Sequence, residues 1–220
     1  MVDITFVCLS KSKKNQEFCV AGKIIHTDGS IGQWIRPVNK FGSIDERDCL
    51  YADKSQATSL DVITATFIRG VPQKFQTENY LIDSEKYWVK RRGYDFNIPA
   101  LNKLCDQPQT LWTNNHESGG GIKDQVSPAE AANIKESLYF IYVGDITIYT
   151  SRWQNEKVKV RGEFVYNCDT YNLKITDLFW LNYYEDKELG KHPLNGRYIT
   201  ISLALETYGG FHYKLIAEMM

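Results

Sequence analysis

The 220 residues are enough for one large domain or two small ones, and an apolar fraction of 43% allows a well-packed core. A formal net charge of -1 excludes a histone-like protein that is basic over its whole surface, and it leaves room for a local positive groove. No apolar stretch approaches the roughly 20 residues needed to cross a bilayer, and the amino terminus lacks the pattern of a signal peptide. We therefore expect a cytoplasmic protein with no membrane partner.

The first third of the chain reads as a series of short strands. The predicted strands are residues 4–10, 17–25, 31–38 and 59–72. Asp28 and Gly29 form a turn signal between the second and third of these. Short strands separated by turns at about 8–12-residue spacing indicate a β-sandwich or a small barrel.

The middle of the chain has a different character. A possible N-cap at Asp83 or Ser84 predicts a short helix over residues 83–93, and residues 98–105 read as a second helical turn. Ser127 is a further candidate N-cap, because a proline follows it directly and a glutamate stands three residues on, as in a capping box. The sequence therefore predicts a helical connector.

Strand signals return in the last third. The predicted strands are residues 137–152, 157–166, 171–178, 196–205 and 211–220. We therefore predict a mainly β protein with a helical connector and two OB-like small β-barrels, because a five-stranded barrel of this size is the OB fold. The expected boundaries are residues 1–82 for the first barrel, 83–137 for the connector and 138–220 for the second barrel.

Trp34 and Arg36 are the first candidate binding residues. Side chains alternate along a strand, so these two point to one side and Ile35 to the other. A flat aromatic beside a guanidinium could stack on a nucleobase and bind a phosphate, or the two could form an ordinary surface cation–π pair. We expect both side chains to be partly exposed along a groove.

Two basic segments are further candidates. Lys11, Lys13 and Lys14 lie between the first two strands, where they could contact phosphates or simply keep a loop solvated. Lys159 and Arg161 alternate with valines, so they share one face of a strand with Lys157. That strand is either part of a platform for single-stranded nucleic acid or an ordinary amphipathic outer strand.

Aromatic residues flank the second basic segment. Phe164 and Tyr166 share a face, and Gly162 would allow a β-bulge before them, which would place basic and aromatic groups on one platform. A further aromatic group is expected to cap the open end of the second barrel rather than clamp a base; it consists of Phe179, Trp180, Tyr183 and Tyr184. The glycine-rich residues 117–124 lack the ending of a P-loop and are expected to form a flexible loop.

No catalytic or metal-binding constellation is evident in the sequence. The five cysteines contain no CxxC pair, and the four histidines show no close ligand spacing. Cys8 and His26 could be neighbours across two strands, but a strand cysteine is usually a core residue. We therefore expect no catalytic residues, metal or cofactor, and we favour a non-enzymatic protein.

The segments that carry a family resemblance run through the whole chain in order. They are VCLSKSKKNQEFCVAG, WIRPV, QTENYL with Trp88 downstream, SLYFIYV, FVY followed by YNLKITD, and ISLALE followed by FHYKLIA. Together they resemble the bacterial dual OB-containing domain family. The matching positions are Cys8, Lys13, Gly22, Trp34, Arg36, Gln76, Asn79, Tyr171, Asp177, Tyr213 and Lys214. The resemblance implies two OB folds and a part in nucleic-acid transactions, in genome defence or in mobile elements.

These observations lead to one leading function and two alternatives. The leading one is a non-catalytic module that binds single-stranded nucleic acid within a bacterial defence or mobile-element system. Phosphate contacts are expected from the lysines at 11, 13, 14, 159 and 214 and from Arg36 and Arg161, and stacking from Trp34 and Tyr166. The alternatives are a protein–protein adaptor that recruits an effector protein, and a small hydrolase or nucleotide-processing enzyme with its site between the barrels.

Overall fold

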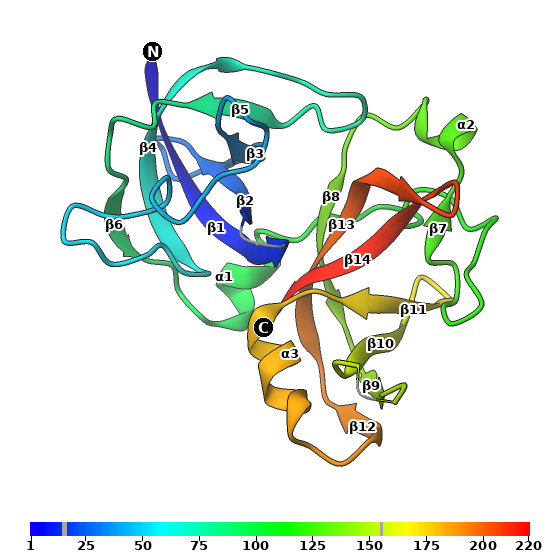
Figure 1. The fold of residues 1–220 in the computed structure, drawn as a ribbon. Coiled ribbons are helices and arrows are strands. Elements are labelled where there is room, and N and C mark those ends of the chain that lie inside the picture. Colours follow the sequence, from blue (N-terminus) through cyan, green and yellow to red (C-terminus); the bar gives the residue numbers. More distant parts are fainter. Residues whose placement is uncertain (15–16, 155) are drawn as a thin grey trace. The chain divides into compact units, whose positions relative to one another are not determined.

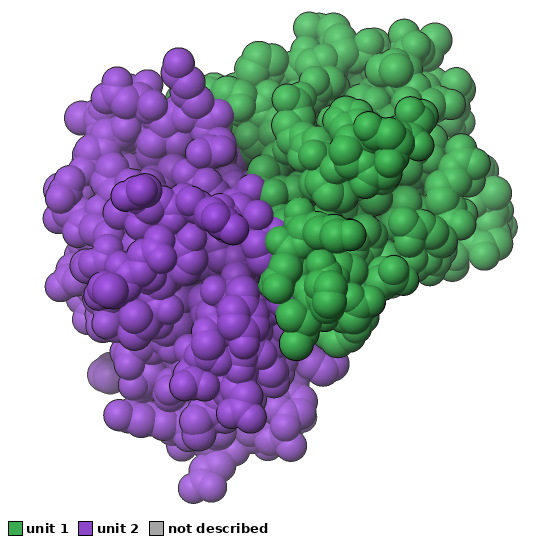
Figure 2. All heavy atoms as spheres, turned by 180° about the vertical axis from the view of Figure 1, so that it is seen from behind, with its two compact units in different colours: residues 1–104 green, residues 105–220 purple. Residues whose placement is uncertain are grey.

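The computed structural model describes the chain except residues 15, 16 and 155, and the side chains of residues 13, 14 and 17 also lie outside the described part. The chain forms two compact units, Met1–Leu104 and Cys105–Met220, which Figure 2 shows in different colours. Both units are built mainly from β-strands, as predicted. Within the described residues, no helix is both long enough and apolar enough to cross a membrane.

The first unit is a closed β-barrel (Figure 1). Its elements are β1 (Val2–Lys14), β2 (Glu17–Ile25), β3 (Ile31–Val38), β4 (Asp61–Gly70), β5 (Asn79–Ile82), β6 (Val89–Gly93) and α1 (Ile98–Asn102). The strands follow the order β1-β2-β3-β5-β4, and β4 pairs again with β1 to close the circuit. Among the described residues of this barrel, the β3–β5 pairing is parallel and the other strand pairings are antiparallel. This is the five-stranded arrangement expected of an OB fold.

The core of the first unit is aromatic. Phe6 packs edge-on against both Phe67 and Trp88, and all three side chains are buried. Complete burial of such a side chain contributes about 1.5–3 kcal/mol. Trp88 therefore anchors the segment that follows it to the barrel.

The prediction of a helix over residues 83–93 is wrong. Val89–Gly93 forms β6, which pairs with β4 outside the closed circuit. The apparent N-cap Asp83 instead makes a turn, because its carboxylate accepts a hydrogen bond from the backbone N–H of Glu85. A buried Trp88 and a long-range strand ladder outweigh the local helix signals. The helical turn expected near residue 98 is confirmed as α1.

The second unit follows the same circuit. Its elements are β7 (Gln125–Val126), α2 (Pro128–Ala131), β8 (Leu138–Val143), β9 (Ile146–Ser151), β10 (Lys159–Tyr166), β11 (Asp169–Ile175), α3 (Leu178–Glu185), β12 (Gly190–Leu194), β13 (Arg197–Tyr208) and β14 (Phe211–Met219). β8 and β9 are separated by only two residues, and they act as one bent strand that pairs with β13 at one end and β10 at the other. The order β10-β11-β14-β13 completes the barrel, and β12 adds to its edge beside β9.

Local capping signals in the second unit are confirmed. Ser127 and Glu130 form the predicted capping box at the start of α2. Asp177 caps α3 by accepting a hydrogen bond from the backbone N–H of Phe179, and its other carboxylate oxygen accepts one from Met219. The expectation that four aromatic residues cap the open end of the barrel is met only in part. Tyr184 belongs to the core and Trp180 packs against it, whereas Phe179 and Tyr183 are exposed.

The β-bulge expected at Gly162 is not formed. Both ladders of β10 keep their register from Arg161 through Glu163. The glycine serves close packing instead, because a Cβ there would lie 2.8 Å from the side chains of Ile146 and Ile216. Side chains of β10 therefore alternate without interruption.

The predicted boundaries of the two barrels and the connector, at residues 82 and 137, stay predictions.

Candidate nucleic-acid interface

Trp34 and Arg36 are buried rather than partly exposed. Each is only 8% exposed, so the prediction that they line a groove as accessible side chains is wrong. Arg36 forms an ion pair with Glu78 at 3.0 Å, and the Nζ of Lys23 lies 5.5 Å from the centre of the Trp34 ring. Glu78 precedes β5 and is 42 residues away in sequence, so strand alternation alone could not reveal this partner. A part for either residue in binding stays a prediction.

The first basic segment is not a loop. β1 continues through Lys14 and pairs with β2, so these lysines belong to a strand hairpin. The Nζ of Lys11 donates hydrogen bonds to the Gln56 side chain at 2.7 Å and to the Ala57 carbonyl at 2.9 Å. Lys11 thus fixes a neighbouring segment of the chain. Lys13 and Lys14 have side chains outside the described part, and their contacts with phosphate stay predictions.

The second basic segment lies on the outer face of the sheet of the second barrel. The cross-strand register aligns Lys191 with Tyr149, Tyr149 with Arg161, and Arg161 with Lys174. Directly paired residues point to the same face of a sheet, so these four side chains form a line across β12, β9, β10 and β11. We call this line the basic row. Lys174 and Lys191 at its ends are exposed, and Tyr149 and Arg161 between them are half-buried.

The basic row is internally ordered. The Nζ of Lys191 lies 5.2 Å from the centre of the Tyr149 ring, a cation–π distance. The Tyr149 hydroxyl donates a hydrogen bond to Glu163 at 3.0 Å. Lys159 stands two residues before Arg161 and is exposed beside Glu156, with an ion-pair distance of 3.1 Å. The prediction that Lys159 and Arg161 share one face is therefore confirmed.

Arg161 is partly neutralised by the segment that precedes β7. We call residues 113–124 the strap. The carboxylate of Asp124 is buried and lies 2.7 Å from the Arg161 guanidinium. Ser118 donates two hydrogen bonds to the same carboxylate, from its backbone N–H and its hydroxyl. Ile122 exchanges two backbone hydrogen bonds with Asn172 of β11. The glycine-rich segment is thus fastened to the barrel by many contacts.

Lys214 does not face solvent. It is fully buried, and its Nζ donates hydrogen bonds to the Thr113 carbonyl and to the Asn114 side chain while lying over the Tyr171 ring. Burial lowers the pKa of Lys214 from its ordinary value to about 7, and the negative charge of Asp124 partly opposes this. Lys214 therefore secures the strap.

Tyr166 lies on the opposite side of β10 from the basic row. Its ring packs against the barrel core, and its hydroxyl donates a hydrogen bond to the Pro108 carbonyl at 2.9 Å. The predicted platform needed a bulge at Gly162 to bring Tyr166 to the basic face. Because the register is continuous, Tyr149 of the neighbouring strand is the aromatic residue on that face instead.

The first unit contains a groove that no sequence motif indicated. It has a volume of about 400 Å³ and is lined by Val38, Asn39, Lys40, Gly42, Arg69, Val71, Pro72, Gln73, Asn79 and Leu81. We call it the β3–β5 groove. These residues come from the ends of β3 and β4, from the two loops that follow those strands, and from β5. Their proximity depends on the β3–β5 pairing, which no local sequence pattern specifies.

Alternation could have identified some of the missed residues on the second barrel. Lys174 lies in a predicted strand, three positions after the buried Tyr171, and points away from the core. The alignment with Lys191 and Tyr149 depends on register, however, and β12 was not predicted.

Among the described residues, no group of three or more His, Cys, Asp or Glu side chains is placed to hold a metal ion.

Comparisons with known proteins place the chain in a family. No curated protein gives a significant match. Among solved structures, the tetrameric p202 HIN2 crystal structure is 9% identical, with a TM-score of 0.34 over 100% of this chain and 91% of that one. A murine DNA-binding protein bound to double-stranded DNA is also 9% identical, with a TM-score of 0.37 over 100% and 94%. Likenesses this low carry no functional argument. The family model of the dual OB-containing domain matches residues 4–219, and the chain therefore belongs to the dual OB-containing domain family.

Proposed function

We propose that this protein is a nucleic-acid-binding module that favours single strands. The observation that supports this most directly is the basic row, which places three cations and a tyrosine in line on one face of the second barrel. In the circuit of that barrel, β10 and β11 correspond to the second and third strands of an OB fold. The face of those two strands is where OB folds hold oligonucleotides.

The dimensions of the basic row suit an extended strand. Neighbouring β-strands lie about 4.8 Å apart, so the row spans about 14 Å, enough for contacts with more than one phosphate. Lys174 and Lys191 are exposed cations that can approach a backbone, and Tyr149 offers an aromatic ring between them. Basic and aromatic side chains in this combination bind single strands with little sequence preference.

Affinity should be moderate and dependent on salt. The net charge of -1 gives little long-range attraction, so local contacts must supply most of the binding energy. Because Arg161 is paired with Asp124, it is less available to bind a phosphate. The exposed lysines then carry the main electrostatic contribution.

The test is a fluorescence anisotropy titration with labelled single-stranded and duplex oligonucleotides of equal length. We expect tighter binding of the single strand, and a several-fold loss of affinity in Lys174→Ala that is similar for different sequences. Lys135→Ala is the matched control, because Lys135 is an exposed lysine of the second unit outside the basic row. Equal losses in the two variants would reject the assignment of the site to the basic row.

A second candidate function is supported by α3. Phe179 is 67% exposed and Tyr183 is 48% exposed on this helix, where their rings stack with centroids 6.3 Å apart. Exposed neighbouring aromatic residues favour a protein partner, as an adaptor would need. A Phe179→Ser/Tyr183→Ser variant should then lose a co-purifying effector protein while binding oligonucleotides like the wild type.

The cellular setting rests on the family resemblance alone. A part in a bacterial defence or mobile-element system stays a prediction, and so does a nucleotide-processing activity with a site between the barrels. Purification without nuclease, followed by analysis of any retained nucleic acid, addresses the binding proposal first.

A further inference from the structure

We propose that the β3–β5 groove of the first unit binds a single nucleotide, either free or at the end of a strand. This site is separate from the basic row, which belongs to the second unit. Its volume of about 400 Å³ lies within the range of about 300–1,000 Å³ that is typical of small-ligand pockets. Its lining combines apolar, amide and cationic groups. These groups can contact the ring of a nucleobase, its polar edge and the phosphate, respectively.

The charge of the groove favours a phosphate. Lys40 and Arg69 both line it, and both side chains are exposed. None of the lining residues is acidic, and within the described part of the chain no ion pair involves Lys40 or Arg69. Two cations without neutralising carboxylates at one groove attract an anionic ligand, and Arg69 can bind a phosphate through two parallel hydrogen bonds.

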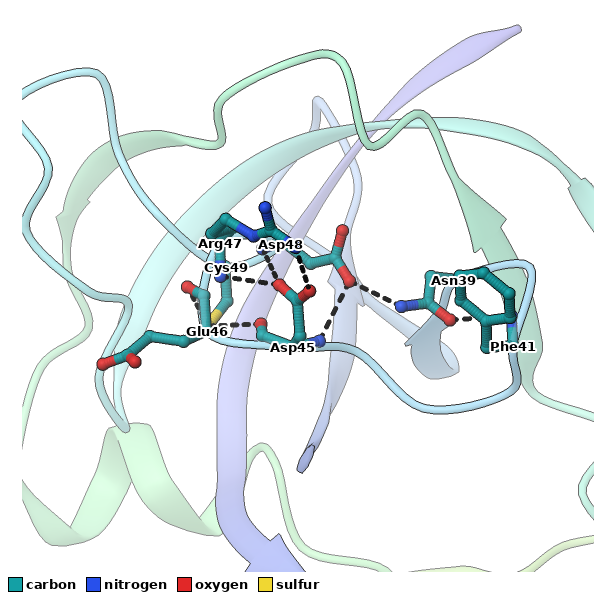
Figure 3. Close-up of polar contacts among 7 residues, drawn as sticks. All are labelled: Asn39, Phe41, Asp45, Glu46, Arg47, Asp48 and Cys49. Atoms are coloured by element: carbon teal, nitrogen blue, oxygen red, sulfur yellow. Dashed lines mark hydrogen bonds and ion pairs between the residues drawn. The ribbon is translucent and has the colours of Figure 1, made fainter. Parts of the chain in front are cut away.

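An aromatic residue stands beside the groove on a braced loop. Phe41 is 81% exposed and lies between the lining residues Lys40 and Gly42. Its backbone N–H donates a hydrogen bond to the Asn39 side chain at 2.8 Å, and the Asn39 amide donates one to Asp48 at 2.7 Å (Figure 3). The Nζ of Lys40 lies 5.0 Å from the centre of this ring, so a nucleobase would stack on the face that Lys40 leaves open.

The wall of the groove contains an acceptor with an unmet hydrogen bond. Asn79 is 4% exposed, and its amide nitrogen donates to the Gln76 side chain at 3.3 Å. Its Oδ1 has no hydrogen-bond partner among the described residues. Buried polar groups are normally paired, so this acceptor is an exception. The atom itself is covered, so an amino group, as adenine and cytosine have, would reach it only after the Asn79 side chain turns toward the groove.

The experiment is isothermal titration calorimetry of the full chain at low salt with AMP, adenosine and inorganic phosphate. We expect AMP to bind more tightly than adenosine or phosphate, because base and phosphate contact different parts of the groove. Arg69→Ala and Phe41→Ala should each weaken AMP binding by about tenfold, as loss of one charged or one stacking contact predicts. Lys86→Ala, an exposed lysine of the same unit outside the groove, should bind AMP like the wild type.

Two further arms identify the source of the nucleotide and the site. AMP should compete with a 5′-phosphorylated oligonucleotide if the groove takes strand ends, whereas a strand without that phosphate should be a weaker competitor. The Lys174→Ala/Lys191→Ala variant should keep its AMP affinity. The test of the groove therefore does not depend on whether the basic row binds single-stranded nucleic acid. The proposal is overturned if wild-type protein binds AMP no better than phosphate, or if Arg69→Ala and Phe41→Ala retain wild-type affinity.

Discussion

Lys214 is a fully buried lysine, held by the Thr113 carbonyl and the Asn114 side chain. Hydrogen-bond and ion-pair partners that are distant in sequence determine which of the basic residues can contact a ligand. Arg36 is paired with Glu78, and Arg161 is paired with Asp124. A sequence shows which residues are basic, but not which of them a distant carboxylate will bind. Lys174, in contrast, is exposed and can contact a ligand.

Stability should rise with pH because of Lys214. Burial lowers its pKa in the folded state to about 7, whereas the unfolded chain keeps the ordinary value of 10.5. Between these values the unfolded state binds more protons, so the cost of burying the charge is present below pH 7 and is progressively relieved above it. Lys214→Met removes this dependence.

The expected measurement is the free energy of unfolding by urea at pH 7, 8 and 9. The difference between wild type and Lys214→Met should shift in favour of the wild type by up to about 1.4 kcal/mol per pH unit. Taking the difference cancels the titration of other groups, such as the buried tyrosines. Parallel curves for the two proteins would show that Lys214 keeps its proton in the folded state throughout this range.

Asp124→Asn should increase affinity for nucleic acid. The amide oxygen can still accept the hydrogen bond from the Ser118 backbone N–H, and the amide NH2 group can donate to the Ser118 hydroxyl. The amide no longer neutralises Arg161, whose charge is then available to a phosphate although its guanidinium stays hydrogen-bonded to Asn172. We expect tighter binding of a single strand and a salt dependence that is steeper by about 0.7 in the log–log slope. Removal of one charge from a buried pair should also cost stability, by up to about 3–5 kcal/mol. Unchanged affinity in a folded variant would mean that Arg161 takes no part in binding.

At the level of secondary structure, signals carried by neighbouring residues were reliable only where no long-range pairing competed with them. The capping box at Ser127 formed as predicted because all its hydrogen bonds lie within four residues. Strand alternation located most strands, because one side of each is buried in a barrel. The helix predicted over residues 83–93 failed because Trp88 is buried and β6 pairs with β4, which depends on contacts far along the chain.

Gly22 of β2 illustrates a constraint that only the paired strands reveal. A Cβ at this position would lie 2.0 Å from the backbone oxygen of Val7 in β1, so any side chain must push two strands apart. Gly22→Ala should therefore destabilise the first barrel by about 1–3 kcal/mol or more. Gly93→Ala is the control, since no heavy atom lies within 4 Å of its ideal Cβ. Equal thermal midpoints for the two variants would contradict this account of β1–β2 packing.

At the level of the whole chain, two units repeat one circuit without an evident sequence repeat. In each barrel, three consecutive strands are followed by a crossing connection, counting β8 and β9 as one strand, and the third barrel strand pairs in parallel with the fifth, as β3 does with β5 and β11 with β14. The fold class could be predicted because short strands and turn signals recur along the chain. The surfaces of the two units could not, because the basic row depends on cross-strand register and the β3–β5 groove on the approach of separate loops.

The central claim is that the basic row binds single-stranded nucleic acid. Its most direct test is an anisotropy titration of a labelled single strand with wild type and Lys174→Ala/Lys191→Ala at several salt concentrations. The wild-type log affinity should fall linearly with log salt, and the slope of the double variant should be smaller by about 1.4, or about 0.7 for each lost phosphate contact. Lys135→Ala should match the wild type. A folded wild type that binds no single-stranded DNA or RNA at low salt, or a double variant with the wild-type slope, would contradict the claim.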